Sequence, residues 1–516
     1  METEKVYKNL SAIGLQVDGQ YYIYERYTNH LVKVDDVVYE ILDDSLVSSC
    51  EEVLEKYSNQ FKTDEIRKAY KNIFNMQENQ GLFTSYVIPE LSISNSKSLR
   101  KKVRQKLKGG LTELVFNVTE DCNLRCRYCI YSGAYKDRRK HNKKNDISFD
   151  TVKKAIDFFL KNSEEKEQRF ISFYGGEALL RFDFIRQVIT SVHKKNPELS
   201  FSITSNGTLI TPAILDFLSE HKVRLSLSLD GPQEIHDANR IFANNKGTFK
   251  RVEKNIQLIR DKYPDYYSQY IKINAVVVPH KFGDQALNEF FPPERFSFLS
   301  DETKLKVGLV NPAENDFIPK NGYYNYLEEL FESLKRNYIK SHCQNEQSGF
   351  PSLESKIFGR KMRLIHYRPH VHMKDYAFFW PNGICLPGMR SLFVSADGSF
   401  YPCEKLYDYH DMKIGDINSG FDFDKISQYI EDYIKCVHSI CSTCWAFRFC
   451  SECFLSIRHK GRNDIKMRLW YCQSQKKSII EHLEMYIKIR SCKPDAFDYL
   501  EKDRENASYL DYMIED

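Results

Sequence analysis

Alternating apolar and polar residues open the chain, and three helical patterns follow them. Residues 21–34 alternate as two short strands around Asn29, which predicts a hairpin with that residue in its turn. Apolar residues then recur at helical spacing over 37–42, 50–61 and 64–78. Ser49 and Thr63 stand where the second and third helices would begin, and both residue types are favoured N-caps. The pattern predicts a small α+β domain over residues 1–95.

Strand and helix patterns alternate through the centre of the chain. Strand candidates lie at 113–118, 169–174, 199–205, 223–229, 270–278 and 304–310. Apolar residues three and four apart predict helices between them, at 149–163, 182–195 and 211–221. Such alternation is typical of an α/β fold with a parallel sheet and right-handed crossovers. Because a full barrel needs eight such units, the centre is predicted to stop short of one.

The rest of the chain has weaker patterns. Residues 96–108 are rich in Lys and Arg and are predicted to be a solvated connector. A helical pattern at 323–338 predicts a helical bridge over 311–372. Residues 393–401 predict a hairpin with Asp-Gly at its turn. The acidic segment 493–516 is predicted to be an exposed helix or a disordered end.

Composition places the chain among globular proteins and leaves its charge uninformative. Of its 516 residues 42% are hydrophobic, which is enough for several cores. The 75 basic and 71 acidic residues nearly balance, so no strong field favours nucleic acid or a membrane. The start of the sequence has no apolar signal segment and no run approaches 18 apolar residues, which predicts a cytoplasmic protein. Its 14 cysteines are then expected to be reduced thiols, and metal ligands rather than disulfides.

Three of these cysteines, Cys122, Cys126 and Cys129, lie within eight residues, shortly after the first central strand. Three thiolates so close together can hold three corners of a cubane iron–sulfur cluster and leave one iron open for chemistry. The alternative is zinc, but zinc takes four closed ligands and no fourth cysteine lies near. The spacing favours an iron–sulfur cluster.

This spacing, with Tyr128 before the last cysteine, resembles the signature of the radical S-adenosylmethionine (SAM) enzymes. In that family the open iron chelates SAM, and an electron from the cluster breaks a carbon–sulfur bond to give a 5′-deoxyadenosyl radical. The resemblance implies a partial (β/α)6 barrel over residues 96–310, with SAM at the carboxyl ends of its strands. By the same resemblance Gly175, Gly176 and Glu177 would bind the SAM amino group, and Arg240 its carboxylate.

Other strand ends complete the rim that the resemblance implies. The residues concerned are Ser205, Asn206, Ser228, Asp230 and Val277. Ser228 would face the ribose, and the segment around Val277 would pack against adenine. Asn206 and Asp230 are equally consistent with turn or cap residues, and Val277 with plain core. These alternatives stay open from sequence alone.

The remaining cysteines gather towards the C-terminus. Their order resembles the SPASM domain of radical SAM peptide maturases, which carries two auxiliary four-iron clusters, except that two residues rather than three separate Cys450 from Cys453. The resemblance assigns the outer auxiliary cluster to Cys441, Cys444, Cys450 and Cys472. It assigns the inner one to Cys385, Cys403 and Cys453. That set is one ligand short, so either Cys343, Cys436 or Cys492 closes it or the site stays open for a substrate thiolate. A zinc knuckle formed by Cys441, Cys444, Cys450 and Cys453 is the alternative.

The resemblances lead to one leading hypothesis and two alternatives. The chain is expected to use SAM and three [4Fe-4S] clusters to modify a ribosomally made precursor peptide, forming cysteine thioether cross-links with a flavodoxin or ferredoxin as electron donor. The domain at 1–95 is winged-helix-like; its mixed charges favour a leader peptide over DNA as ligand. The second hypothesis is a sulfatase-type formylglycine maturase with Glu404 as its base. The third is a zinc-bearing winged-helix regulator.

With these resemblances the chain divides into five predicted parts. They are a recognition domain at 1–95, the barrel at 96–310, a bridge at 311–372, a SPASM domain at 373–492 and an acidic tail at 493–516.

Overall fold

The N-terminal part is an antiparallel sheet followed by three helices. The computed structural model describes residues 4–88, 96–133, 135, 139–164, 166–278, 304–310, 323–344, 353–368, 370, 384–459 and 462–499. The sheet runs in the order β1 (Glu4–Val6), β2 (Ala12–Val17), β3 (Gln20–Glu25) and β4 (His30–Val34). Asn29 has φ +64° between β3 and β4, which confirms the predicted hairpin and its turn residue. The strands β1 and β2 were not predicted.

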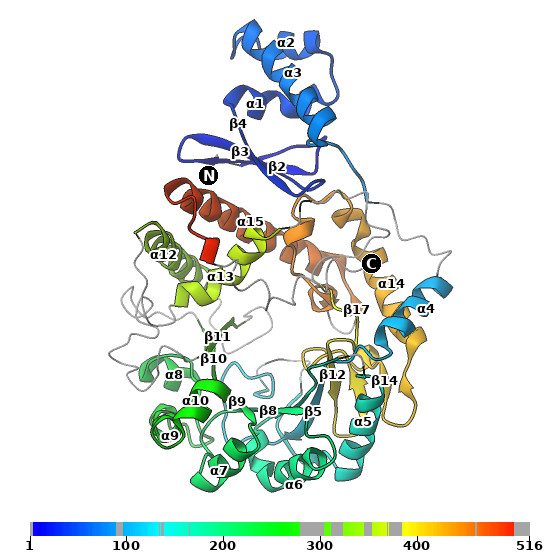
Figure 1. Ribbon diagram of the computed structural model, residues 1–516, viewed down its shortest axis with the longest axis vertical. Coiled ribbons are helices and arrows are strands. Elements are labelled where there is room, and N and C mark those ends of the chain that lie inside the picture. The colour runs from blue at the N-terminus through cyan, green and yellow to red at the C-terminus, as the bar shows by residue number, and fades with distance from the viewer. Residues whose placement is uncertain are drawn as a thin grey trace.

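Three helices cover one face of this sheet: α1 (Asp36–Ser45), α2 (Cys50–Tyr57) and α3 (Thr63–Gln80). Asp35 caps α1, and Ser49 forms a capping box with Glu52 at the start of α2. The other face of the sheet packs on the rest of the protein, because Ile13, Leu15 and Tyr24 belong to the main hydrophobic core. The sheet is therefore held between its own helices and the C-terminal part, as Figure 1 shows around β2 and α15.

The predicted solvated connector is wrong, because residues Ser96–Leu107 form a helix, α4, that packs against α14 (Phe423–Cys441). Val103 and Leu107 are buried, and Leu99 packs beside them at the same four-residue spacing. Arg100 forms an ion pair with Asp424, and Arg104 lies over the ring of Phe423 at 4.8 Å. The many Lys and Arg residues on the exposed face of α4 made its amphipathic pattern hard to recognise in the sequence.

We expect Leu107→Ala to lower the free energy of unfolding by about 2–4 kcal/mol, since the side chain is fully buried in the main hydrophobic core. Lys101→Ala, on the exposed face of the same helix, should change it by less than about 0.5 kcal/mol. Urea denaturation followed by circular dichroism measures both. Equal small effects would show that α4 is indeed a loosely held connector.

The centre of the molecule is a parallel sheet. Its strands lie in the order β11 (Lys304–Leu309), β10 (Ile271–Val277), β9 (Arg224–Ser228), β8 (Ser200–Ser205), β7 (Phe170–Gly175) and β5 (Glu113–Glu120). All six correspond to predicted strands, and neighbouring strands are parallel. A short strand β6 (Asn142–Asp146) pairs antiparallel with the end of β5.

Helices connect these strands, so the predicted α/β alternation is confirmed. They are α5 (Phe149–Lys161), η2 (Ala178–Arg181), α6 (Phe182–His193), α7 (Pro212–Glu220), α8 (Gln233–Asn239), α9 (Phe249–Lys262) and α10 (Pro264–Tyr270). In Figure 1 they form the outer layer of the lower half of the molecule. Ser148 and Thr211 cap α5 and α7, which fixes where the chain leaves the sheet.

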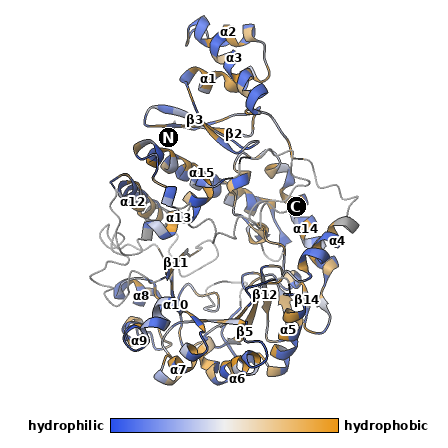
Figure 2. Cartoon of the chain, in the orientation of Figure 1, coloured by the Kyte–Doolittle hydropathy of each residue, from blue (hydrophilic) through white to orange (hydrophobic). Residues whose placement is uncertain are grey.

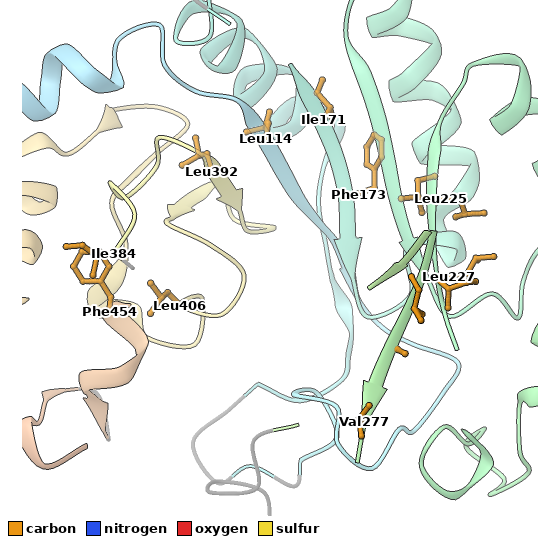
Figure 3. Close-up of a cluster of buried hydrophobic side chains, with 14 of the residues drawn as sticks. Leu114, Ile171, Phe173, Leu225, Leu227, Val277, Ile384, Leu392, Leu406 and Phe454 are labelled. Atoms are coloured by element: carbon orange, nitrogen blue, oxygen red, sulfur yellow. The ribbon is translucent and has the colours of Figure 1, made fainter. Parts of the chain in front are cut away.

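The central sheet does not end at β5. The strand β12 (Ser391–Val394) pairs parallel with β5, in a register that places Leu392 beside Leu114. It begins the predicted hairpin with β13 (Ser399–Tyr401), and β14 (Gly415–Asp416) and β15 (Gly420–Phe421) continue the sheet. One hydrophobic core runs through both parts: Figure 3 shows Leu114 and Phe173 of the central strands together with Leu392 and Phe454. Figure 2 shows the same strands as predominantly hydrophobic.

Further helices complete the C-terminal half. They are α12 (Tyr323–Gln344), α13 (Leu353–His366), η4 (His410–Met412), α14, η5 (Phe447–Phe449), η6 (Phe454–Ile457) and α15 (Ile465–Cys492), with the small ribbon β16 (Arg458–His459) and β17 (Arg462–Asn463). The helix α13 lies within the predicted helical bridge, although no helical pattern was identified at its own residues. Phe497, in the predicted exposed tail, is fully buried and stacks on Tyr486 at 5.4 Å, so this part of the tail is packed. Residues 311–322 and 500–516 of the predicted bridge and tail lie outside the described residues.

Cys343 and Cys492 form a disulfide, which corrects the expectation that all cysteines are reduced thiols. The two residues lie at the ends of α12 and α15, and these helices pack side by side. Cα atoms 5.8 Å apart suit a disulfide. Both sulfurs are therefore committed to each other. No described helix is long and apolar enough to cross a membrane.

Candidate functional site

The three cysteines of the first loop lie where the chain leaves β5. Cys122 begins the loop, Cys126 is buried, and the backbone N–H of Cys129 donates to the carbonyl of Cys126 at 3.1 Å. The thiols of Cys126 and Cys129 both act on the pKa of Cys122, so the three are electrostatically coupled. Burial raises the pKa of Cys122 and of Cys126 to about 12, so these thiols need a cation to hold them as thiolates.

Gly175 and Gly176 at the end of β7 are required by close contact with the chain itself. A Cβ on Gly176 would lie 2.1 Å from the carbonyl oxygen of Asp121, and one on Gly175 would lie 2.2 Å from that of Thr119. The N–H of Gly176 donates to the Thr119 carbonyl at 2.8 Å. The resemblance assigned these glycines to the SAM amino group, and that assignment stays a prediction. Their absent side chains allow β7 to press on the segment that leads to Cys122.

Glu177 is a buried carboxylate that joins two strand ends. Its oxygens accept the N–H groups of Leu179 and Asn206 and the hydroxyl of Ser205, at 2.7–3.0 Å. Burial raises its pKa, and these three donors oppose the rise. Asn206 also donates from its amide to the sulfur of Cys122 at 3.8 Å. The structure therefore brings Glu177, Ser205 and Asn206 together with the cysteine loop.

A second buried group joins the cysteine loop to β9 and β10. The hydroxyl of Tyr128 hydrogen-bonds a carboxylate oxygen of Asp230, and Arg240 donates to the same hydroxyl at 2.6 Å. The other oxygen of Asp230 accepts the N–H of Val276 at 2.9 Å. Among the described residues the Nε of Arg240 is buried without a hydrogen-bond partner. Arg240 therefore has a donor left for an anionic ligand. Ser228, at the end of β9, is buried beside this group.

Val277 faces the hydrophobic core rather than this group, which agrees with the plain-core alternative that the sequence left open. Its side chain is fully buried with residues of the main core (Figure 3). Side chains alternate along a strand, and Val276 and Val278 are the ones that pack with Tyr128. Val276 and Val278 are therefore the residues of this segment that lie near Tyr128, and the adenine contact stays a prediction.

The C-terminal cysteines fall into two groups. The pKa of Cys441 responds to Cys444 and Cys450, and that of Cys472 to Cys444, so these four thiols act on one another. They come from the end of α14, the loop after it and α15, and they are the predicted outer set.

Cys385, Cys403 and Cys453 form the second group. The Cys453 thiol raises the pKa of Cys385, and the Cys385 thiol raises the pKa of Cys403. The charged groups that act on Cys436 are Asp464 and Arg468 rather than any thiol. With Cys343 and Cys492 joined to each other, none of the spare cysteines is placed as a fourth ligand of this inner set.

Glu404 follows Cys403 and lies beside Tyr174, at the end of β7. Burial raises the pKa of Tyr174, and the Glu404 carboxylate raises it further. Arg139 holds this segment against the cysteine loop, because it donates to the Glu404 carbonyl at 3.1 Å and forms an ion pair with Asp408. The structure thus places Glu404 on the side of the barrel that carries the first cysteine loop.

The donors present fit the groups that the sequence implies. Three soft thiols on one loop suit an iron–sulfur cluster, while Glu177 and the free donor of Arg240 suit the ammonium and carboxylate of an amino acid. Within the described ranges no three His, Cys, Asp or Glu side chains gather closely enough to hold a single metal ion. The thiols interact at longer range, and a cubane cluster holds its thiolates farther apart than a single ion does.

Sequence reasoning missed three buried arginines at these sites. Arg468 donates to the sulfurs of Cys441 and Cys450, at 3.9 and 3.6 Å. It stands four residues before Cys472 on α15, so helical spacing offered a signal. Arg26 and Arg139 offered none, because their partners are remote in sequence.

Comparisons with known proteins agree with this geometry. The family model of the radical SAM superfamily matches residues 116–288. The cysteine-type anaerobic sulfatase-maturating enzyme of Clostridium perfringens is 26% identical over 377 residues, which cover 71% of this chain and 94% of that protein. An uncharacterized protein of Methanocaldococcus jannaschii is 31% identical over 247 residues, or 44% of this chain and 78% of that protein. The structure of native anSMEcpe with bound AdoMet and Cp18Cys peptide has 22% identity and a TM-score of 0.54, covering 74% of this chain and 99% of that one.

Proposed function

Because the chain belongs to the radical SAM superfamily, we propose that it modifies a ribosomally synthesised precursor peptide, and that the modification is a cysteine thioether cross-link. The observation that supports the proposal is that three parts of the protein are in contact within one structure. The first cysteine loop, the inner cysteine group with Glu404 and the N-terminal sheet all join one continuous structure.

We assign the first cysteine loop to the catalytic cluster, with SAM beside it. When bound, the cluster and SAM supply a 5′-deoxyadenosyl radical that abstracts a hydrogen atom from the substrate. Glu177 receives the ammonium of SAM, and its three hydrogen-bond donors favour the ionised carboxylate against the effect of burial. Arg240 receives the carboxylate through its unpartnered Nε, while Asp230 and Tyr128 fix the orientation of its side chain. Val276 and Val278 line the same side as Tyr128 and exclude water there.

Closing a thioether removes two hydrogens from the peptide. One leaves a carbon as an atom, the thiol loses the other as a proton, and one electron must be accepted when the carbon–sulfur bond forms. We assign this proton to Glu404, whose carboxylate acts on Tyr174 at the end of β7. The outer and inner cysteine groups would hold the two auxiliary clusters that accept the electron, and a flavodoxin or ferredoxin would be the external partner.

The N-terminal domain is the proposed site for the leader of the precursor. Among the described residues β1 and β4 each pair on one side only, so an extended peptide can add to an edge of this sheet. We retain residues 1–95 as this recognition domain, 96–310 as the barrel, 311–372 as the bridge and 373–492 as the SPASM region.

A sulfatase-type maturase is the second candidate function. The relative from Clostridium perfringens aligns over nearly its whole length, and Glu404 is the proposed base for this reaction as well. Nearly a third of this chain lies outside that alignment, however, which favours a substrate with a further recognition element.

We expect the reconstituted protein, given SAM, a reductant and the Cys-containing peptide encoded beside its gene, to lower the peptide mass by two hydrogens per cross-link. Mass spectrometry after thiol alkylation measures this, because a thioether sulfur can no longer be alkylated. An unchanged mass with full alkylation would contradict the thioether proposal. Conversion of a Cys to formylglycine in a sulfatase-derived peptide would instead establish the second candidate.

The inner site is expected to keep one iron open, since no spare thiol is placed to close it. Adding the substrate peptide should then perturb the electron paramagnetic resonance signal of the inner cluster, and a peptide with Cys replaced by Ser should not. Cys436→Ala is the matched control and should leave that signal intact. Loss of the inner cluster in the control would show that Cys436 is its fourth ligand.

A further inference from the structure

The two largest fully buried side chains of the described structure are both arginines, and both face the outer cysteine group. Arg468 lies on α15 and donates to the sulfurs of Cys441 and Cys450 as well as to the hydroxyl of Ser456 at 2.8 Å. Its pKa responds to Cys472 as well. One guanidinium group thus acts on three of the four thiols of the outer set.

Arg26 approaches the same group from the N-terminal domain. It follows β3 in the hairpin turn, and its Nη1 donates to the carbonyls of Ser442 at 2.8 Å and Cys444 at 3.4 Å. Ser442 is the C-cap of α14, so its carbonyl lies at the negative pole of the helix dipole, where a cation is favourable. An arginine side chain keeps its charge at neutral pH.

The contact between the two parts is reciprocal. Arg448, between Cys444 and Cys450, donates to the carbonyls of Arg26 and Tyr27 at 2.7 and 2.9 Å. The ring of Tyr24 packs on Phe449 at 5.0 Å. The loop that carries the outer cysteines is therefore fixed by the hairpin of the N-terminal domain.

Two buried cations need negative charge nearby. Arg26 has a carboxylate neighbour in Glu25, but burial raises the pKa of Glu25 to about 7, so at neutral pH that carboxylate is only partly ionised. A [4Fe-4S] cluster held by four thiolates has a net charge of about −2 in its oxidised form. The charges of Arg26 and Arg468 would balance it, and a buried charge persists only when it is compensated.

We infer that Arg26 and Arg468 are charge-compensating residues of the outer auxiliary cluster, so that the N-terminal domain supplies one of the cations that set its reduction potential. The inference rests on the proposed function, because it requires an iron–sulfur cluster at the outer cysteines. A cation beside the cluster stabilises its reduced form, which has one more negative charge, and therefore raises the potential.

The test uses the full-length protein with Cys122, Cys126 and Cys129 replaced by Ala, so that only auxiliary clusters contribute. Arg26→Gln and Arg468→Gln are each expected to lower the potential of the outer cluster, measured by titration monitored with electron paramagnetic resonance. The Lys variants should fall between Gln and the parent, and the double Gln variant should be lowest. Arg67→Gln, an exposed arginine of the same N-terminal domain, is the matched control and should change nothing. Cys441→Ala with Cys444→Ala identifies which signal belongs to the outer cluster.

Unchanged potentials in both Gln variants, with iron and sulfide intact, would overturn the inference. If a Gln variant loses the outer cluster, retention in the Lys variant supports the charge role, and equal loss in both contradicts it. Zinc in place of iron in the unmodified protein would refute the proposed function itself, so the two failures are distinguishable.

Discussion

Replacing Cys122, Cys126 and Cys129 together by Ala is expected to reduce reductive SAM cleavage to background. The cysteine thiols among the main influences on the pKa of Cys122 are those of Cys126 and Cys129, so the three form one group. The C-terminal cysteines are untouched, so about two thirds of the iron should remain if each site holds a four-iron cluster. Anaerobic reconstitution, iron and sulfide analysis and chromatography of 5′-deoxyadenosine measure these quantities.

Cys436→Ala provides the matched control for that experiment, since it removes a thiol outside both C-terminal groups. It should leave cleavage and iron content unchanged. Full SAM cleavage by the triple variant would contradict the assignment of the catalytic loop, whichever metal or cluster the C-terminal cysteines bind.

Gly176→Ala is expected to have the second largest effect. The new methyl group would meet the Asp121 carbonyl at 2.1 Å, so the backbone that leads to Cys122 must move. Overpacking of this kind lowers the free energy of unfolding by about 1–3 kcal/mol. A shift of about 1 Å at the site would also slow SAM cleavage by about 100-fold. Denaturant titration and cleavage per iron measure the two effects.

Gly359→Ala is the matched control, because nothing lies within 4 Å of its Cβ position on α13. There the substitution should stabilise the protein by about 0.5–1 kcal/mol. If Gly176→Ala behaved like this control, the close packing of β7 on the cysteine loop would play no part in the site.

The sequence predicted the structure correctly where the deciding interactions join residues that are close together in the chain. The spacing of Cys122, Cys126 and Cys129 and the alternation of six strands predicted the loop and the sheet, because both follow from neighbouring residues. The hairpin at Asn29 was predictable for the same reason. In each case the interaction that decides the structure lies within a few positions of the residue.

Prediction failed where a distant partner decides the outcome. The Lys and Arg residues of α4 conceal an apolar stripe that only α14 explains. Val277 and Val276 are equally apolar, and the face of the sheet that each occupies depends on register. Arg26 sits in an ordinary turn, and its role depends on a loop some 415 residues later in the chain.

The pairing of β12 with β5 has a consequence for how the protein is made. Until residues Ser391–Val394 leave the ribosome, β5 has an unpaired edge along the half of its length that β12 later covers. Strands with open edges are sites of aggregation during synthesis, and pairings between remote segments form slowly. A nascent chain therefore carries an incomplete sheet for most of its synthesis. Truncation before β12 should yield an insoluble central domain rather than an independent catalytic domain. Slower translation of the C-terminal third would lengthen the time during which the unpaired edge of β5 can aggregate.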